Sequence, residues 1–152
     1  MALEVLMEEQ KASKPGLMVP QVVVFLGEGL LAMGAERPQG IFRLSPKFAD
    51  EAAARAQIDA GALVLPQEIT ICSSMLKTWM RMLPEALIPT RLYETAIAAE
   101  STRDVVEGVL RQLPAHSFAT VAYIAHFIAH LTAPEFVAHT QMTPENFAGV
   151  FA

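Results

Sequence analysis

Residues 71–83 read ICSSMLKTWMRML, and this stretch is the clearest guide to the fold of the chain. Its large apolar side chains recur at intervals of three and four residues, which places them on one face of an α-helix. They are Ile71, Met75, Leu76, Trp79, Met80 and Leu83. Lys77 and Arg81 stand four residues apart and face away from this stripe, in line with Ser73. The stretch therefore predicts an amphipathic helix with a basic outer face.

The same helical spacing recurs on both sides of this stretch. Apolar residues at 121–131 follow it, and those at 105–113 also form a single stripe. Residues 22–26 contain enough valine to pass for a buried strand, but the apolar pattern continues to Met33, which favours a helix. Clusters of Gly and Pro separate these segments. We therefore predict an all-α fold, arranged as an irregular helical bundle.

Three short signals mark expected helix starts. Serine and proline at 45–46 are a candidate N-cap and first helical position for a helix over 48–58. Ser101 with Asp104 resembles a capping box, in which the serine hydroxyl accepts a hydrogen bond from the backbone N–H three residues on. Threonine and proline at 143–144 open a last helix.

Composition limits the class of protein. A length of 152 residues fits one domain, and a formal net charge of -5 argues against nucleic acid as the main partner. No apolar run approaches the ~18 residues of a transmembrane segment. The N-terminus lacks the basic region and continuous apolar segment of a secretory signal, and the single Cys72 fits a reducing compartment. We therefore expect a cytoplasmic protein without a transmembrane segment.

The basic residues allow two interpretations each. Lys77 and Arg81 form a like-charge pair, which costs a few tenths of a kcal/mol in an isolated helix and favours a negatively charged partner on that face. The alternative is an ordinary solvated helix face. Arg43 lies in GIFRLS between turn residues, and a cation on a braced loop could stabilise charge in a transition state. Equally, it could pair with a carboxylate or a helix end.

Other chemistry receives little support from the sequence. His126 and His130 have the spacing that brings two imidazoles onto one helix face, but no Cys or carboxylate cluster nearby offers a third zinc ligand. The phosphate-binding motif GxxxxGK[ST], the GxSxG elbow and a GxGxxG after a strand are all missing. We therefore assign no cofactor and no metal.

Three motifs, taken in order and spacing, resemble the RhoGAP family. Residues 19–45, VPQVVVFLGEGLLAMGAERPQGIFRLS, resemble the first helix of that family and the loop that presents its arginine. Residues 76–88, LKTWMRMLPEALI, resemble the family's LKxxLRELPxPL helix. Residues 141–152, QMTPENFAGVFA, resemble its KMTxxNLAxVFAP stretch. The similarity extends from about Leu17 to the end of the chain.

The resemblance implies a domain that stimulates GTP hydrolysis by Rho-family small GTPases in their GTP-bound state. In this family Arg43 would be the arginine finger, supplied in trans to the active site of the partner. Lys77 and Arg81 would line the surface that receives the GTPase and help to hold the finger loop, and Asn146 would contact the GTPase or fix that loop. The domain would then be an activator and not itself an enzyme, and the GTP and Mg²⁺ would belong to the partner.

The resemblance also sets domain boundaries. Residues 1–16 would be a lead-in helix, similar to that of RhoGAP domains that follow a myosin-tail homology 4 module. Residues 17–152 would form a RhoGAP-like domain that lacks its C-terminal end, because the chain stops before the proline that usually follows VFA.

Several positions depart from the family pattern. Many members have glycine where this chain has Pro46, a second proline where it has Ala86, and lysine where it has Gln141. One alternative is therefore a module that binds a small GTPase without accelerating hydrolysis. Another is a helical scaffold that binds other proteins through Trp79 and the methionines.

Overall fold

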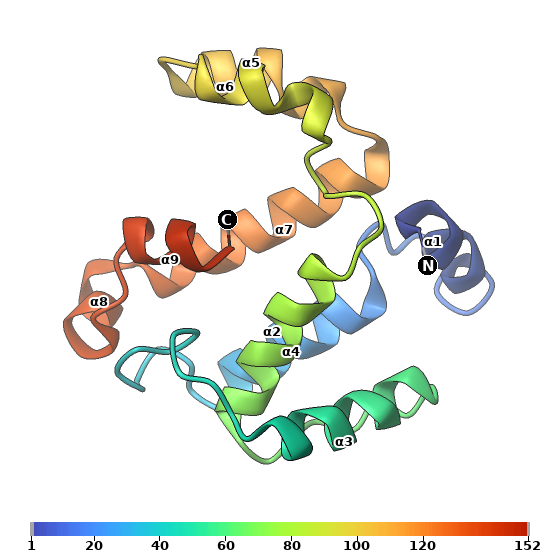
Figure 1. Ribbon diagram of the computed structural model, residues 1–152, viewed down its shortest axis with the longest axis vertical. Coiled ribbons are helices and arrows are strands. Elements are labelled where there is room, and N and C mark those ends of the chain that lie inside the picture. Colours follow the sequence, from blue (N-terminus) through green and yellow to red (C-terminus); the bar gives the residue numbers. More distant parts are fainter. Residues whose placement is uncertain (1, 152) are drawn as a thin grey trace. The chain divides into compact units, whose positions relative to one another are not determined.

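The computed structural model describes residues 2–151, which form helices and connecting loops with no strand (Figure 1). The helices of the first half are α1 (Leu3–Lys11), α2 (Gln21–Ala32), α3 (Phe48–Asp59) and α4 (Ile69–Arg81). Those of the second half are η1 (Thr90–Leu92), α5 (Tyr93–Ile97), α6 (Thr102–Gly108), η2 (Leu110–Gln112), α7 (Ala115–Leu131), α8 (Pro134–Thr140) and α9 (Pro144–Phe151). The all-α prediction is confirmed.

The described chain divides into two compact units. One combines residues 2–20 with 80–124, and the other combines residues 21–79 with 125–151. The first unit has a small apolar cluster of Leu92, Val109 and Leu113. The second contains most of the large side chains that are almost fully buried. They come from α2, α4, α7, α9 and the loops between α2 and α3 and between α8 and α9. They are Val23, Leu26, Leu30, Ile41, Phe42, Leu76, Leu131, Met142 and Phe147.

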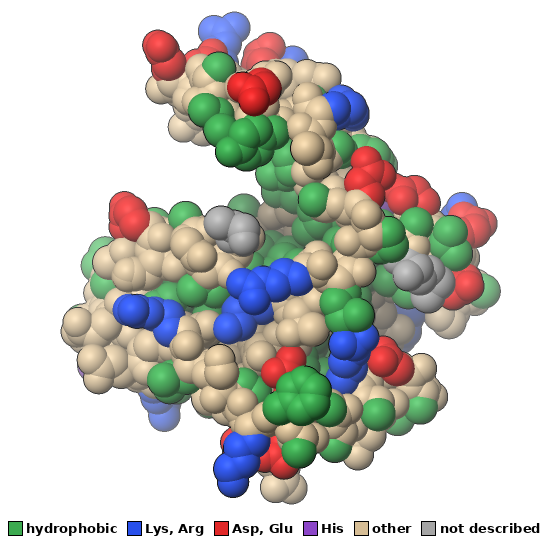
Figure 2. Space-filling model, in the orientation of Figure 1, with side chains coloured by type: hydrophobic (Ala, Val, Ile, Leu, Met, Phe, Trp, Pro, Cys, Tyr) green, Lys and Arg blue, Asp and Glu red, His purple; other side chains and the backbone are tan. Residues whose placement is uncertain are grey.

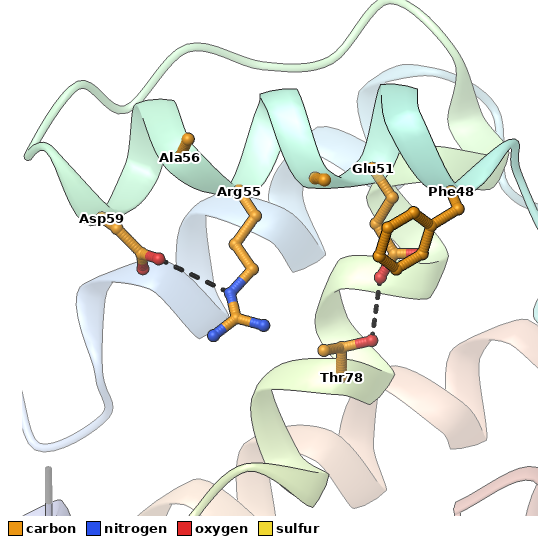
Figure 3. Close-up of a pocket in the computed structure, with 7 residues that line it drawn as sticks. Phe48, Glu51, Arg55, Ala56, Asp59 and Thr78 are labelled. Atoms are coloured by element: carbon orange, nitrogen blue, oxygen red, sulfur yellow. Dashed lines mark hydrogen bonds and ion pairs between the residues drawn. The ribbon is translucent and has the colours of Figure 1, made fainter.

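Helices α2, α3 and α4 of the second unit are tied together by side-chain hydrogen bonds. The Cys72 thiol on α4 donates to the Leu26 carbonyl on α2 at 3.5 Å, and α2 and α4 lie side by side (Figure 1). The Glu51 carboxylate on α3 accepts from the hydroxyl of Ser74 at 2.8 Å. It also accepts from the hydroxyl of Thr78 at 2.9 Å (Figure 3). Burial raises the pKa of the Cys72 thiol to about 12, so this cysteine stays a neutral packing group.

Two of the three expected helix starts are confirmed. The Ser101 hydroxyl accepts from the Asp104 N–H at the start of α6, and the Thr143 hydroxyl accepts from the Asn146 N–H at the start of α9. The third expectation is wrong, because α3 begins after Lys47, with no side-chain cap, and Ser45 lies outside the helix. The first turn of α3 is exposed, so water can satisfy its free N–H groups without a side-chain cap.

Two other expectations about helices need correction. The single helix predicted over 105–113 is broken at Val109, whose φ of -120° and ψ of -65° separate α6 from η2. Ser73 is also not on a solvated face: it is fully buried, and its hydroxyl donates to the Thr70 carbonyl at 3.1 Å. Residues 71–76 of α4 are all buried, so the helix is enclosed on every side there, and its polar face begins only at Lys77.

In residues 2–151 no single helix is long and apolar enough to cross a membrane. Helices α7 and α8 meet the length and composition test only when taken together, and they are separated by a bend of 77°.

Candidate functional site

Arg43 lies on the loop between α2 and α3, residues 33–47, which we call the Arg43 loop. Its side chain is exposed, and within residues 2–151 its guanidinium makes no hydrogen bond and no ion pair. The backbone N–H of Arg43 donates to the Gly40 carbonyl at 2.9 Å, so the residue closes a tight turn. A carboxylate or helix-end partner for Arg43, one of the two interpretations of the sequence, is not found in the described chain.

Two hydrogen bonds anchor the Arg43 loop to neighbouring helices. The Gly40 N–H donates to the carbonyl of Thr140, the last residue of α8, at 2.7 Å. Gly40 has a φ of 71°, a left-handed conformation that glycine adopts without strain. The Lys77 ammonium on α4 donates to the Phe42 carbonyl at 2.5 Å. The loop is therefore fixed directly before Arg43.

Phe42 has an unusual backbone for its residue type. Its φ is 69°, in the left-handed region, which is an outlier for a bulky residue and costs about 1–3 kcal/mol. The residue is 1% exposed, and its ring contacts three other phenylalanine rings. We call these four rings together the Phe42 cluster. The ring centroids lie 6.1 Å from Phe127, 5.6 Å from Phe147 and 5.3 Å from Phe151. This packing opposes relaxation of the strained backbone.

The structure brings three of the four predicted site residues into one unit. Lys77 contacts the Arg43 loop directly. Asn146, partly exposed, lies in the first turn of α9, and its side-chain amide has no hydrogen-bond partner in the described chain. Phe147, the next residue, packs on Phe42, the residue before Arg43. Arg81 is one turn beyond Lys77 on α4 and exposed; it is assigned to the other unit.

Figure 2 shows several Lys and Arg side chains close together on the viewed face, in the region of α4 and the Arg43 loop. Phe48, the first residue of α3, is a large apolar side chain that is 88% exposed (Figure 3). A groove of about 390 Å³ lies between α3 and α4, lined by Phe48, Glu51, Arg55 and Thr78, among others (Figure 3). None of the predicted site residues lines this groove. The Glu51 carboxylate in it already accepts hydrogen bonds from two hydroxyls of α4.

The two histidines singled out in the sequence lie on α7. His130 Nε2 is 3.6 Å from the Glu36 carboxylate, and its ring centroid is 5.1 Å from that of Phe136. His126 is exposed. Residues 2–151 contain no group of three His, Cys, Asp or Glu side chains that could hold a metal ion.

Sequence reasoning missed two residues that shape this site. Nothing in the sequence indicates the left-handed backbone of Phe42, because that conformation is expected at Gly, Asn or Asp. Glu51 was not singled out because its partners, Ser74 and Thr78, lie more than 20 residues away. What the site can do chemically follows from Arg43: an exposed cation on an anchored loop, without a partner in residues 2–151, can stabilise negative charge on another molecule.

Comparison with known proteins agrees with this geometry. A family model described as the RhoGAP domain matches residues 20–152. GTPase activating protein homologs 3 and 2 of Dictyostelium discoideum are each 31% identical to this chain over 99% of its length. The crystal structure of human Rho GTPase activating protein 15 matches with a TM-score of 0.85 and 21% identity, over 99% of this chain and 72% of that one.

The chain belongs to the RhoGAP domain family, since the family model matches most of its length. The structural likeness independently supports the same fold. The chain spans only 11% and 17% of the length of the two Dictyostelium relatives, so it corresponds to a small part of those proteins.

Proposed function

We propose that this domain stimulates GTP hydrolysis by GTP-loaded Rho-family small GTPases, with Arg43 as an arginine finger supplied in trans. The single observation that carries the proposal is the state of Arg43: an exposed guanidinium, unpaired in residues 2–151, on a loop anchored to α4 and α8. The names of the relatives, GTPase activating protein and Rho GTPase-activating protein, support the same activity and partner class.

The chemistry of phosphoryl transfer explains why an arginine is needed. The γ-phosphoryl group departs through a loose transition state in which charge grows on the leaving oxygen and spreads over the equatorial oxygens. A guanidinium neutralises this charge, and its planar fork of donors reaches two oxygens at once, which a lysine ammonium does not. The partner supplies the GTP and the Mg²⁺, so this chain is an activator that completes another protein's active site.

The other site residues receive supporting roles in the proposal. Lys77 holds the backbone next to Arg43 through the Phe42 carbonyl, so it fixes the direction of the finger. Arg81, four residues further along the same helix, presents a second cation to the GTPase. Asn146 offers its amide to the GTPase from α9.

We further propose that residues 17–152 carry this activity and that residues 1–16, which include α1, lead into it. The proposed partner class also makes the cytoplasm the expected place of action, because Rho-type GTPases signal there. The second candidate function is a module that binds a small GTPase without accelerating GTP hydrolysis. It is motivated by Pro46 and Ala86, where the chain departs from the family pattern.

The proposal is tested by phosphate release from a panel of GTP-loaded Rho-family GTPases. The comparison uses the wild-type domain, Arg43→Ala, and Arg37→Ala as a matched control, because Arg37 is an exposed arginine on the same loop. We expect stimulation that Arg43→Ala reduces by about 10³-fold or more, the scale of an arginine finger, and that Arg37→Ala retains. Binding without stimulation by the folded wild-type domain would favour the second candidate.

A further inference from the structure

The backbone of Phe42 is the most unusual feature of the unit that contains Arg43. A phenylalanine at a φ of 69° persists only where surrounding contacts hold it, and such outliers gather at functional sites. Here the contacts are the three other rings of the Phe42 cluster, which come from α7 and α9. The outlier lies directly before the proposed finger.

The connection between Phe42 and Arg43 is covalent and short. The two residues share one peptide unit, so rotation at φ of Phe42 redirects the chain on which the guanidinium is carried. The carbonyl of that peptide unit accepts from Lys77, and the same turn is closed by the Arg43 N–H on Gly40. A change in the packing of the Phe42 ring would therefore change the direction in which Arg43 points.

Helix α9 has a special place in this arrangement. Phe147 and Phe151 are four residues apart on one face of α9, and both contact the Phe42 ring. Phe147 is fully buried, and its neighbour Asn146 is partly exposed. The helix that offers an amide to the proposed partner is thus the helix that holds the ring beside the finger.

We propose that the Phe42 cluster is a positioning device: Phe147 and its neighbours hold Phe42 in the left-handed conformation and thereby fix the direction of Arg43 before a GTPase binds. This inference rests on the proposed function. Phe42 and Phe147 are positioning residues, because they act through Arg43 and do not touch the partner's phosphates. Fixing the finger in advance matters because an error of ~1 Å in the placement of a catalytic group can cost about 100-fold in rate.

An ordinary core residue would affect stability alone, so the test needs two further measurements. The variant Phe147→Leu removes a ring from the cluster and keeps an apolar side chain. The matched control is Leu26→Val on α2, a residue just as buried but outside the cluster. Hydrogen exchange of the Gly40 and Arg43 amides measures the order of the loop without any GTPase, and single-turnover hydrolysis separates the saturating rate from the half-saturating domain concentration.

For Phe147→Leu we expect exchange at these two amides to be about tenfold faster or more, beyond the change in Leu26→Val, because the loop opens locally. The saturating rate should fall about 10- to 100-fold, with the half-saturating concentration within about threefold of wild type. Unchanged exchange in the loop, or an equal loss of rate in Leu26→Val, would overturn the positioning role.

Two precautions keep the result decisive. If Phe147→Leu does not fold, Phe127→Leu, which alters the cluster from α7, is measured against the same expectations and can overturn the proposal in the same way. If the wild-type domain stimulates no GTPase, the proposed function fails, while the exchange measurement still decides whether the cluster fixes the loop.

Discussion

Replacing Lys77 with methionine tests how firmly the Arg43 loop is held. Lys77→Met keeps a long apolar stem but removes the ammonium that donates to the Phe42 carbonyl. A hydrogen bond from a charged donor contributes about 1.5–3 kcal/mol, and the Phe42 carbonyl belongs to a buried residue that would lose this donor. For a domain of this length each kcal/mol corresponds to about 2–4 °C, so the unfolding midpoint should fall by about 3–12 °C.

The assay is thermal unfolding followed by circular dichroism, with Lys47→Met as the control. Lys47 is an exposed lysine on the same loop, and its side chain makes no hydrogen bond or ion pair in the described chain, so its replacement should leave the midpoint nearly unchanged. The exchange rate of the Arg43 amide should rise in Lys77→Met only. Equal midpoints for the two variants would refute the idea that Lys77 anchors this loop.

Two further predictions concern hydrogen bonds elsewhere in the same unit. Glu51→Ala leaves the largely buried Ser74 hydroxyl without its acceptor, so urea unfolding should show a loss of about 2 kcal/mol that the exposed neighbour Asp50→Ala does not show. Two hydrogen bonds hold the pKa of the Glu145 carboxyl below its usual 4.5. The larger effect comes from the Thr143 hydroxyl and the smaller from the backbone of Glu145 itself. A lowered folded pKa gives stability that is present above pH 4.5 and lost as the pH falls through the folded value. Thr143→Val should raise the pKa of Glu145 towards 4.5 in a carboxyl NMR titration, and an unchanged pKa would contradict the assignment.

Helix positions were predictable wherever local chemistry decides them. The apolar stripe of 71–83 led to α4, and the caps at Ser101 and Thr143 were read correctly because a cap joins residues three apart. Predictions from local sequence patterns were wrong where contacts between distant residues determine capping and burial. Ser45 does not cap α3, and Ser73 is buried because other parts of the fold enclose α4 over residues 71–76.

The candidate site was predictable in part. Motifs and resemblance led to Arg43, Lys77, Arg81 and Asn146, since each is a residue type with chemistry of its own. The conformation of Phe42 could not be predicted, because the three rings that pack on it lie on α7 and α9. These rings are more than 80 residues away from Phe42 in the sequence. Spacing alone also left open whether Arg43 pairs internally, and only the folded chain shows its guanidinium without a partner in residues 2–151.

The central claim is that Arg43 stabilises the transition state of another protein's reaction. The most direct test measures binding of the domain to its GTPase loaded with GDP alone and with GDP and aluminium fluoride, which mimics the transferring phosphoryl group. The account predicts that the mimic strengthens binding of the wild-type domain by about 100-fold or more, and that Arg43→Ala loses this gain. An equal gain in Arg43→Ala would contradict the account.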